Sequence, residues 1–403
     1  MKNIKETKDY KFRFGYQEDL SHELPIIKGL DTRFHHTYIV GKTGAGKSTL
    51  LEHLAEYDIN QDIATIFIDP KGESVKKLYE LTNDKSRIIY ISIESPVIIN
   101  PINKEGYSLD NLIQEFIQIL DVLITLTASN PESTVMMRMI IGYAIRSIKK
   151  EKDKNIKYLT DLFLLKDERV KLLRELKEGT DEHKFWKEFD FKQNYQMQES
   201  AKRVAARLSE ISTGEMKDFV VGRNELDITD IVNNKKVVLV DTSRMNRNSR
   251  IYLSNLLVYA VLSYCEFAKK KENPLMVYVD EFQIVVSSLF SELLARSRSS
   301  KVGFTLAHQT FHQIPKNILS DIFGTVSTQI CFRCGDEEAL RFAPIFDTTF
   351  KEMYNLDDFQ AWLRIKNKNI LIKTYPPKLT KTPELEFNQK QSYMFLGDEW
   401  IDI

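Results

Sequence analysis

A glycine-rich segment near the N-terminus constrains the fold more than any other feature of this sequence. Residues 37–50 read TYIVGKTGAGKSTL, and residues 41–48 match the phosphate-loop pattern G-x-x-x-x-G-K-[ST]. The apolar run Tyr38–Val40 predicts a buried strand before the loop, and Leu50, Leu51 and Leu54 predict an apolar helix face after it. A strand and a helix on either side argue against a chance glycine-rich turn. The segment therefore predicts a nucleotide-binding site.

Each part of this loop suits a phosphorylated nucleotide. Its glycines lack a Cβ, so the backbone can curl until its N–H groups converge on a phosphate. The start of the following helix adds unpaired N–H donors and the positive end of the helix dipole. We expect Lys47 to reach the β- and γ-phosphates of ATP and Ser48 to be a ligand of Mg²⁺. The predicted nucleotide-binding residues are Gly41, Lys42, Thr43, Gly44, Ala45, Gly46, Lys47, Ser48 and Thr49.

A second apolar run ends in the carboxylates that ATP hydrolysis requires. Leu275–Val279 is followed directly by Asp280 and Glu281, which is the Walker B pattern. At the carboxyl end of a central strand, Asp280 can hold Mg²⁺ and Glu281 can polarise the water that attacks the γ-phosphate. An Asp-Glu pair after a strand is a weak signal alone. Together with the phosphate loop it predicts an ATP hydrolase whose cofactors are ATP and Mg²⁺.

Apolar runs alternate with helical patterns along much of the chain, which predicts an α/β fold with a mostly parallel sheet flanked by helices. The other expected strands are Ile63–Ile68, Ile88–Ile93, Val237–Asp241, Val302–Ala307, Val326–Phe332, and a closing hairpin of Phe359–Ile365 and Asn369–Tyr375. Between about residues 107 and 221 the strand signal disappears, and apolar residues recur at helical spacing. That stretch predicts an inserted all-helical subdomain.

These patterns divide the chain into four predicted parts. We expect a RecA-like P-loop NTPase core in residues 34–106 and 222–377, and the all-α insert in residues 107–221. Residues 1–33 are interpreted as an N-terminal adaptor segment and residues 378–403 as a C-terminal tail.

Composition restricts the compartment and the kind of partner. Lys plus Arg and Asp plus Glu both number 57, so net charge gives no hint of nucleic-acid affinity, and any DNA contact requires a local patch. Three cysteines exclude a disulfide scaffold and fit a reducing cytosol. Met1–Lys11 is too charged for a signal peptide, and Leu256–Cys265 is shorter than the about 20 residues of a membrane helix. We expect a cytoplasmic protein without a transmembrane segment.

Two groups of residues have both a functional and a structural interpretation. Cys331 and Cys334 form a C-x-x-C motif, but no second Cys or His pair accompanies it, which favours a structural role inside a strand over zinc or redox chemistry. Arg33, His35 and His36 directly precede the first core strand. They either contact the nucleotide or are solvated, and solvation is slightly favoured.

The order of the motifs resembles the HerA/FtsK superfamily of DNA-pumping ATPases. The motifs are the phosphate loop, DPKGE at 69–73, NP at 100–101, the helical insert, DEF at 280–282 and LAHQ at 306–309. Within that superfamily the chain is similar to TraG/TraD-type coupling proteins of conjugative DNA transfer and type IV secretion. It matches their arginine-rich helix, their A-H-Q segment and their following "FR" strand. The resemblance covers residues 33–377; the family's membrane helices are missing, and Glu73 replaces an aspartate.

The resemblance implies roles for several polar residues. Gln309 would sense the γ-phosphate, and Arg298 would act in trans on the ATP of a neighbouring subunit, with Arg333 as second candidate. The arginine segment is about one residue longer than usual, so Arg296 stays open as an alternative to Arg298. The resemblance further implies a ring-forming homo-oligomer, a hexamer, that pumps single- or double-stranded DNA through a central pore. A secretion or relaxase-like protein is a candidate partner, and through it the chain would be peripheral at the membrane.

Other functions stay open at this point. The chain could be a viral or mobile-element DNA-packaging pump, a defence-associated pump, or a secretion-system ATPase that moves protein substrates. Stimulation of hydrolysis by DNA or by a protein would separate these. A non-catalytic, nucleotide-gated adaptor is disfavoured, because it needs no complete set of Lys47, Ser48, Asp280 and Glu281. A GTPase or kinase is disfavoured because no guanine-reading N-K-x-D segment is present.

Overall fold

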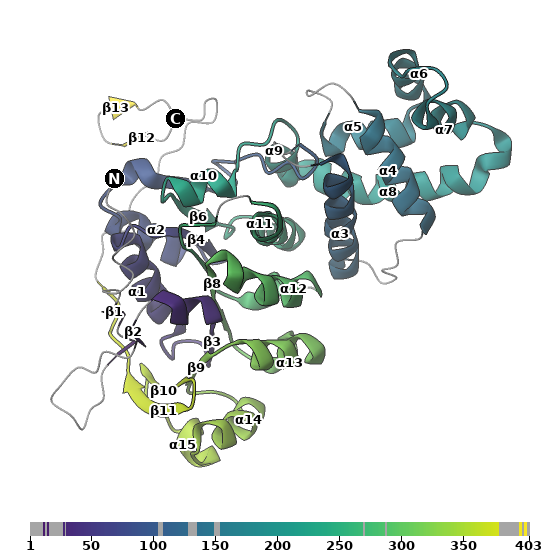
Figure 1. The fold of residues 1–403 in the computed structure, drawn as a ribbon. Coiled ribbons are helices and arrows are strands. Elements are labelled where there is room, and N and C mark those ends of the chain that lie inside the picture. The colour runs from purple at the N-terminus through teal and green to yellow at the C-terminus, as the bar shows by residue number, and fades with distance from the viewer. Residues whose placement is uncertain are drawn as a thin grey trace. The chain divides into compact units, whose positions relative to one another are not determined.

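The computed structural model describes residues 11–12, 14–15, 27–28, 30–103, 108–127, 135–148, 154–268, 271–286, 288–378, 395–396 and 399–400. The chain divides into two compact units (Figure 1). Unit 1 comprises Met1–Ser95, Ile228–Arg244 and Tyr264–Ile403, and unit 2 comprises Pro96–Asp227 and Met245–Ser263. Most of the predicted N-terminal adaptor and C-terminal tail lies outside the described residues, so those two interpretations stay predictions.

A nine-stranded sheet forms the centre of the described part of unit 1, in the order β11-β10-β9-β3-β8-β7-β4-β6-β5. From β9 to β5 all neighbouring strands are parallel, and β10 is antiparallel to both β9 and β11. The strands are β3 (Thr37–Val40), β4 (Ala64–Asp69), β5 (Ile88–Ile91), β6 (Val237–Asp241), β7 (Leu275–Val279), β8 (Val302–His308), β9 (Thr328–Phe332), β10 (Gln360–Ile365) and β11 (Lys368–Lys373). The predicted hairpin therefore extends the parallel sheet at one edge.

Helices cover both faces of this sheet. The helices α1 (Lys47–Asn60) and α2 (Glu73–Leu81) lie on one face, and α12 (Ser288–Ser297) and α13 (Lys316–Thr325) lie on the other (Figure 1). Every residue of β3, β4, β6, β7, β8 and β9 is buried as a result. Strands buried on both faces read as continuous apolar runs, which is why their positions could be predicted to within about two residues.

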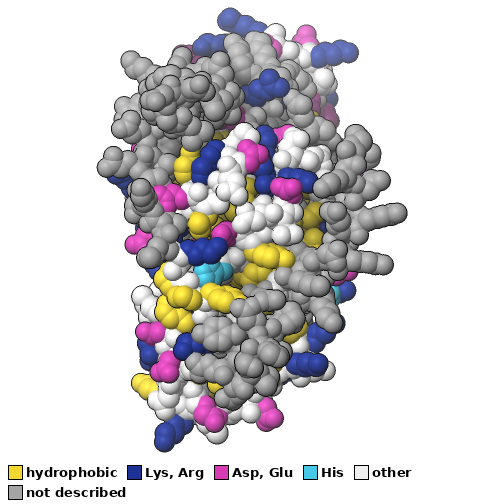
Figure 2. Space-filling model, turned by 90° about the vertical axis from the view of Figure 1, so that its left-hand side faces the viewer, with side chains coloured by type: hydrophobic (Ala, Val, Ile, Leu, Met, Phe, Trp, Pro, Cys, Tyr) yellow, Lys and Arg dark blue, Asp and Glu magenta, His cyan; other side chains and the backbone are white. Residues whose placement is uncertain are grey.

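Two segments distant in sequence pack onto the outer side of α1. Figure 2 shows hydrophobic side chains gathered around a histidine on the side of the molecule that carries α1. The elements β1 (Lys11–Phe12), α1 and the residues after β11 line a pocket of about 420 Å³, whose lining residues are Phe12, His53, Glu56, Tyr57, Asn60, Tyr375, Pro376 and Lys378. Lys378 forms an ion pair of 2.6 Å with Glu56 across it. Residues near both ends of the chain thus contribute to unit 1.

Unit 2 is helical in its described part. It contains α3 (Leu109–Thr127), α4 (Val135–Ser147), α5 (Ile156–Leu164), α6 (Lys166–Glu175), α7 (Asp181–Phe189), α8 (Tyr195–Ser212), α9 (Lys217–Val220) and most of α11 (Arg247–Phe267). The predicted helical character of this stretch is confirmed. Its core includes Trp186, whose indole N–H donates to the Ser147 hydroxyl at 2.8 Å. The buried Asn100 donates to the carbonyls of Lys154 and Gly222, at 2.6 Å each, so the NP motif ties segments of this unit together.

Both interpretations of the residues before β3 are wrong for Arg33 and His36. Arg33 is 2% exposed and donates to the Asp58 carboxylate at 3.1 Å and to the Tyr278 hydroxyl at 2.7 Å. His36 donates from Nε2 to the Leu294 carbonyl at 3.0 Å, and burial lowers its pKa to about 4. These two side chains are neither solvated nor near the phosphate loop. Arg33 is an ion-paired residue of the core, and His36 is an uncharged one.

Contrary to the prediction, the two cysteines of the C-x-x-C motif do not both lie inside a strand. The strand β9 ends at Phe332, so Cys334 lies beyond the strand and not inside it. Both thiols are buried and reduced. Burial, reinforced by the contact with Cys334, raises the pKa of Cys331 well above its ordinary value. No cluster of three or more metal-ligating His, Cys, Asp or Glu occurs among the described residues.

Candidate functional site

The phosphate loop is held open by its glycines and by the neighbouring strand β9. Gly44 and Gly46 have φ angles of 82° and 113°, which L-residues with a side chain rarely adopt. A Cβ on Gly41 would lie 2.6 Å from the Cβ of Phe332. The backbone N–H of Lys42 donates to the carbonyl of Arg333 at 2.7 Å. The phosphate loop therefore packs against the end of β9. Helix α1 begins at Lys47, directly after the glycines of the loop.

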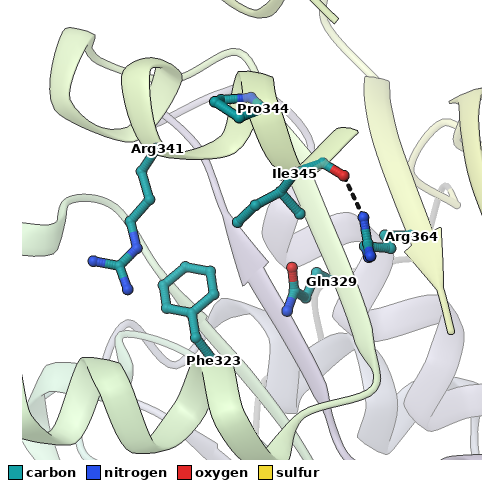
Figure 3. Close-up of a pocket in the computed structure, with 6 residues that line it drawn as sticks. All are labelled: Phe323, Gln329, Arg341, Pro344, Ile345 and Arg364. Atoms are coloured by element: carbon teal, nitrogen blue, oxygen red, sulfur yellow. Dashed lines mark hydrogen bonds between the residues drawn. The ribbon is translucent and has the colours of Figure 1, made fainter. Parts of the chain in front are cut away.

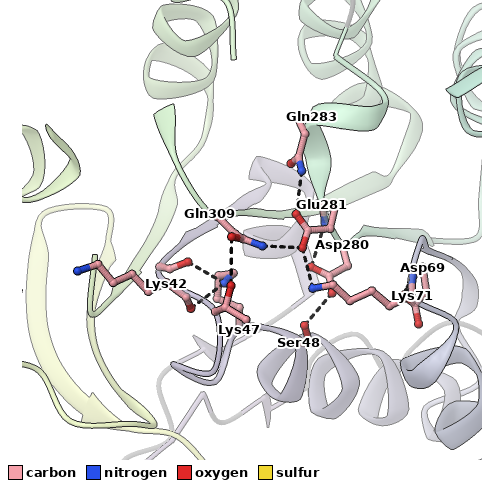
Figure 4. Close-up of polar contacts among 11 residues, drawn as sticks. Lys42, Lys47, Ser48, Asp69, Lys71, Asp280, Glu281, Gln283 and Gln309 are labelled. Atoms are coloured by element: carbon pink, nitrogen blue, oxygen red, sulfur yellow. Dashed lines mark hydrogen bonds and ion pairs between the residues drawn. The ribbon is translucent and has the colours of Figure 1, made fainter. Parts of the chain in front are cut away.

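Lys47 lies folded into its own loop. Its ammonium group donates to the carbonyls of Gly41 at 2.7 Å and Lys42 at 3.0 Å (Figure 4). The side chain is buried, and this burial lowers its pKa, while the carboxylates of Asp280 and Glu281 oppose the shift. An incoming phosphate would have to exchange with these carbonyls as partners of the ammonium.

The two predicted magnesium ligands are in contact. The Ser48 hydroxyl donates to Oδ2 of Asp280 at 2.7 Å, and Oδ1 of Asp280 accepts the backbone N–H of Glu281 at 2.9 Å. Mg²⁺ prefers oxygen ligands and commonly uses one or two carboxylates together with phosphate oxygens and water. A hydroxyl and one carboxylate beside the phosphate loop fit such an ion, with the nucleotide supplying further ligands.

Glu281 is the most constrained side chain of the site. Its backbone has φ 52° and ψ 56°, a left-handed conformation that costs on the order of 1–3 kcal/mol for a non-glycine residue. Its Oε1 accepts from Lys71 at 2.7 Å and from Gln309 at 2.9 Å, and its Oε2 accepts from Gln283 at 2.8 Å (Figure 4). Burial alone raises the pKa of Glu281, but these hydrogen bonds and the Lys71 charge outweigh it and lower the pKa. The carboxylate is thus ionised, and its three hydrogen-bond donors fix its orientation.

Gln309 joins the phosphate loop to the Walker B carboxylates. It follows β8, donates from Nε2 to Glu281, and accepts at Oε1 from the Thr43 hydroxyl at 3.1 Å. The preceding His308 faces the other way: it is buried, contacts the Tyr38 hydroxyl, and burial lowers its pKa to about 4. Only the glutamine of the A-H-Q segment faces the nucleotide site.

Lys71 is a site residue that the sequence reasoning missed. Asp69, the last residue of β4, accepts the backbone N–H groups of Lys71 and Ser74, at 2.8 Å each. Burial raises the pKa of Asp69 to about 6, against the effect of these hydrogen bonds. Asp69 therefore shapes the turn, and the turn directs Lys71 to Glu281. The DPKGE segment is the sequence signal for this residue, but the motif alone does not show which partner its lysine contacts.

The three candidate arginines lie in different places. Arg333 follows β9 on the phosphate-loop side and pairs with Asp358 at 2.8 Å. Arg296 pairs with Glu266 and, at 2.6 Å, with Glu292. The exposed guanidinium of Arg298 forms no hydrogen bond or ion pair with the described residues. It precedes β8, whereas Gln309 follows that strand, so roughly 20 Å of chain separates it from the nucleotide site of its own subunit.

The phosphate loop, the Ser48–Asp280 contact and the Glu281–Gln309 pair all lie at the carboxyl ends of parallel strands, which defines a P-loop NTPase of the α/β class. Residues 28–261, more than half of the chain, match the family described as Helicase HerA, central domain. The chain belongs to this family, and the predicted resemblance is confirmed.

Two solved structures share the fold of this chain. The VirB4 protein of Thermoanaerobacter pseudethanolicus has a TM-score of 0.64 at 13% identity, over 91% of this chain and 97% of that chain. The bacterial conjugative coupling protein TrwB, without its first 70 residues, has a TM-score of 0.59 at 14% identity, over 90% and 88%. Identities this low show the fold alone. They confirm the predicted RecA-like sheet flanked by helices.

One curated relative matches a short part of the sequence. The uncharacterized protein YddE of Bacillus subtilis (strain 168) is 36% identical over 81 residues, which are 20% of this chain and 9% of that protein. The chain thus spans about a tenth of this relative's length. Across the helices that the structure describes, none is both long and apolar enough to cross a membrane.

Proposed function

We propose that this chain is a ring-forming ATPase that uses ATP and Mg²⁺ to move DNA, in the manner of a conjugative coupling protein. The continuous hydrogen-bonded path from Thr43 through Gln309 to Glu281 carries the proposal. It connects the residues that would hold the phosphates to the carboxylate that would position water. A non-catalytic adaptor has no need of this path.

The proposed chemistry is positioning plus electrostatics. Lys47 would leave the Gly41 and Lys42 carbonyls for the β- and γ-phosphates, and Ser48 and Asp280 would hold Mg²⁺. The metal would supply charge neutralisation at the phosphate oxygens. Glu281 would orient the attacking water. Gln309 would respond to the presence of the γ-phosphate through its hydrogen bond with Thr43. Loss of the γ-phosphate would then reach Glu281 through Gln309.

Relatives of the same fold support the choice of cofactor and partner. A solved structure of TrwB contains ADP and Mg²⁺, and TrwB is described there as a plasmid coupling protein. VirB4 has an equally similar fold and is not described as a coupling protein, so the fold alone does not identify the substrate that is moved. Transport of a protein substrate is therefore the competing outcome of the test below.

We expect DNA to raise the ATPase rate of the wild-type chain. DNA affinity should fall linearly on a log–log plot as salt rises, because each neutralised phosphate releases counterions. The rate would be measured with single-stranded DNA, with duplex DNA and without DNA, between about 50 and 200 mM salt. The Lys47→Ala variant is the control for contaminating ATPases. A rate indifferent to both kinds of DNA would favour a protein substrate.

Replacing Lys71 by methionine should move the acid limb of the kcat/KM profile to higher pH. Lys71 lowers the pKa of Glu281, and kcat/KM reports groups of the free enzyme. Hydrolysis needs the ionised carboxylate, so activity falls as the pH drops through the Glu281 pKa. Without Lys71 that pKa rises, and the fall begins at a higher pH.

The Lys71→Arg variant is the matched control, because it retains the positive charge beside Glu281. It should keep an acid limb close to that of the wild type. An unchanged limb in Lys71→Met would show that the 2.7 Å contact does not set the ionisation of Glu281.

A further inference from the structure

A pocket of about 410 Å³ lies in unit 1, and none of its lining residues belongs to the nucleotide site (Figure 3). Four elements enclose it: α13, β9, β10 and α14 (Asp336–Phe346). The lining residues are Phe323, Gln329, Arg341, Pro344, Ile345 and Arg364. Gln329 and Arg364 are directly paired across β9 and β10, so their side chains share one face of the sheet.

Gln329 is the unusual member of this pocket. Its side chain is 8% exposed, and its Oε1 has no hydrogen-bond partner among the described residues. A buried amide oxygen without a hydrogen-bond donor is destabilising, because it has lost its contact with water. In Figure 3 the amide lies in the space between Phe323, Ile345 and Arg364. A ligand that donates a hydrogen bond here would remove this cost.

Two arginines give the pocket positive charge. Arg364 donates to the carbonyl of Ile345 and, at 3.5 Å, to the side-chain oxygen of Asn369, both of which are uncharged. The guanidinium carbon of Arg341 lies 4.2 Å from the ring centroid of Phe323. Neither arginine forms an ion pair within the described residues, and no Asp or Glu lines the pocket. The net positive charge of the lining therefore favours an anionic ligand.

These features together specify the class of ligand. The anion must carry a hydrogen-bond donor for Gln329, and the Arg341–Phe323 stack offers a flat surface of the kind on which bases stack. Glutamine amides read base edges, and arginines bind phosphates. The volume lies within the about 300–1,000 Å³ of ordinary ligand pockets. A nucleotide unit has all of these properties.

We propose that this pocket captures one unpaired nucleotide of a DNA strand, with its base against Arg341 and Gln329 and its phosphate at the arginines. The inference rests on the proposed function and adds a preference to it. A base inside a duplex is stacked on both sides and paired at its Watson–Crick edge, so it cannot enter a pocket. The pocket therefore favours single strands over duplexes.

The test compares a fluorescent thymidine 20-mer with a duplex of equal length. Gln329→Leu and Arg341→Gln should each weaken binding of the single strand by about tenfold, since one captured base is worth roughly 1–3 kcal/mol. Duplex affinity should change much less. The control is Lys316→Gln, which removes an exposed charge at the start of α13, outside the pocket. It should weaken both DNAs equally and slightly.

Thermal unfolding of each variant separates loss of the pocket from loss of the fold. Gln329→Leu removes an unpaired buried amide and should not destabilise the chain, so it remains informative if Arg341→Gln does. Unchanged single-strand affinity in Gln329→Leu, or equal losses for both DNAs, would overturn the proposal. Free thymidine monophosphate is a separate arm: if it binds through Gln329 while the 20-mer does not, the site takes a free nucleotide and the strand assignment fails. Stimulation of the wild-type ATPase by DNA tests the proposed function independently.

Discussion

The Glu281→Gln variant is expected to bind ATP and to hydrolyse it about a thousandfold more slowly than the wild-type chain, which is within the range for loss of a general base. Glutamine preserves the size of the side chain but cannot accept a proton from water. It also loses the charge that attracts Lys71 at 2.7 Å, so the turn at 69–73 should respond as well. Single-turnover hydrolysis and binding of a fluorescent ATP analogue would measure the two steps separately.

Lys47→Ala is the matched comparison for this variant. Lys47 is the charge that would meet the phosphates, so its loss should remove ATP binding itself and not only hydrolysis. We expect Glu281→Gln to bind ATP without hydrolysing it, whereas Lys47→Ala should neither bind nor hydrolyse ATP. A Glu281→Gln protein that turns over at a near-normal rate would remove Glu281 from the catalytic role.

The hydrogen bonds among the site residues show why ATP binding should change the conformation of these side chains. Lys47 donates to carbonyls of its own loop, and Ser48 donates to Asp280. Glu281 accepts from Lys71 and Gln309. ATP with Mg²⁺ would have to replace the first two of these contacts. Because Gln309 also binds Thr43, the exchange would be felt at Glu281 without any large movement. On the proposed function, nucleotide state and catalytic geometry would be coupled through two hydrogen bonds, from Thr43 to Gln309 and from Gln309 to Glu281.

The parts of the fold that were predictable are those where burial alone dictates sequence. The strands β6 and β7 have the predicted bounds, since helices cover both faces of the sheet. Every position of β6 before its last residue, Asp241, is apolar, and so is every position of β7, which Asp280 follows. The phosphate loop was predictable because its glycines are required by backbone geometry. Both signals are local, so no knowledge of distant contacts was needed.

The errors concern side chains whose partners are far away in sequence. Arg33 resembled a surface cation, but its carboxylate partner Asp58 lies on α1 and its hydroxyl partner Tyr278 on β7. Lys71 appeared only as a letter of a motif, because its partner Glu281 is 210 residues away. From the sequence alone, a charged residue is interpreted as solvent-exposed, because a partner of opposite charge that is distant in the sequence cannot be recognised. That information is absent from local pattern and composition.

Arg298→Ala is expected to lower the ATPase rate by about a thousandfold or more, the value of an arginine finger. An arginine finger stabilises the charge that develops on the transferred phosphoryl group. Its guanidinium has no partner among the described residues, and β8 separates it from the nucleotide site of its own subunit. It would therefore act on the ATP of a neighbour in a ring. Arg296→Ala, which breaks the pairs with Glu266 and Glu292, is the control and should keep most of the activity.

Mixing Arg298→Ala with Glu281→Gln distinguishes action in trans from every local role. Each protein is inactive alone, yet an Arg298→Ala subunit retains Glu281 and a Glu281→Gln subunit retains Arg298. In a head-to-tail ring assembled at random from equal amounts, about one interface in four joins an intact Glu281 to an intact Arg298. Hydrolysis should therefore return on mixing, provided that the rings exchange subunits. Should Arg298→Ala keep most of its DNA-independent activity, and mixing give no synergy, the finger would be Arg333 or Arg296, and the same mixing experiment with their alanine variants would identify which.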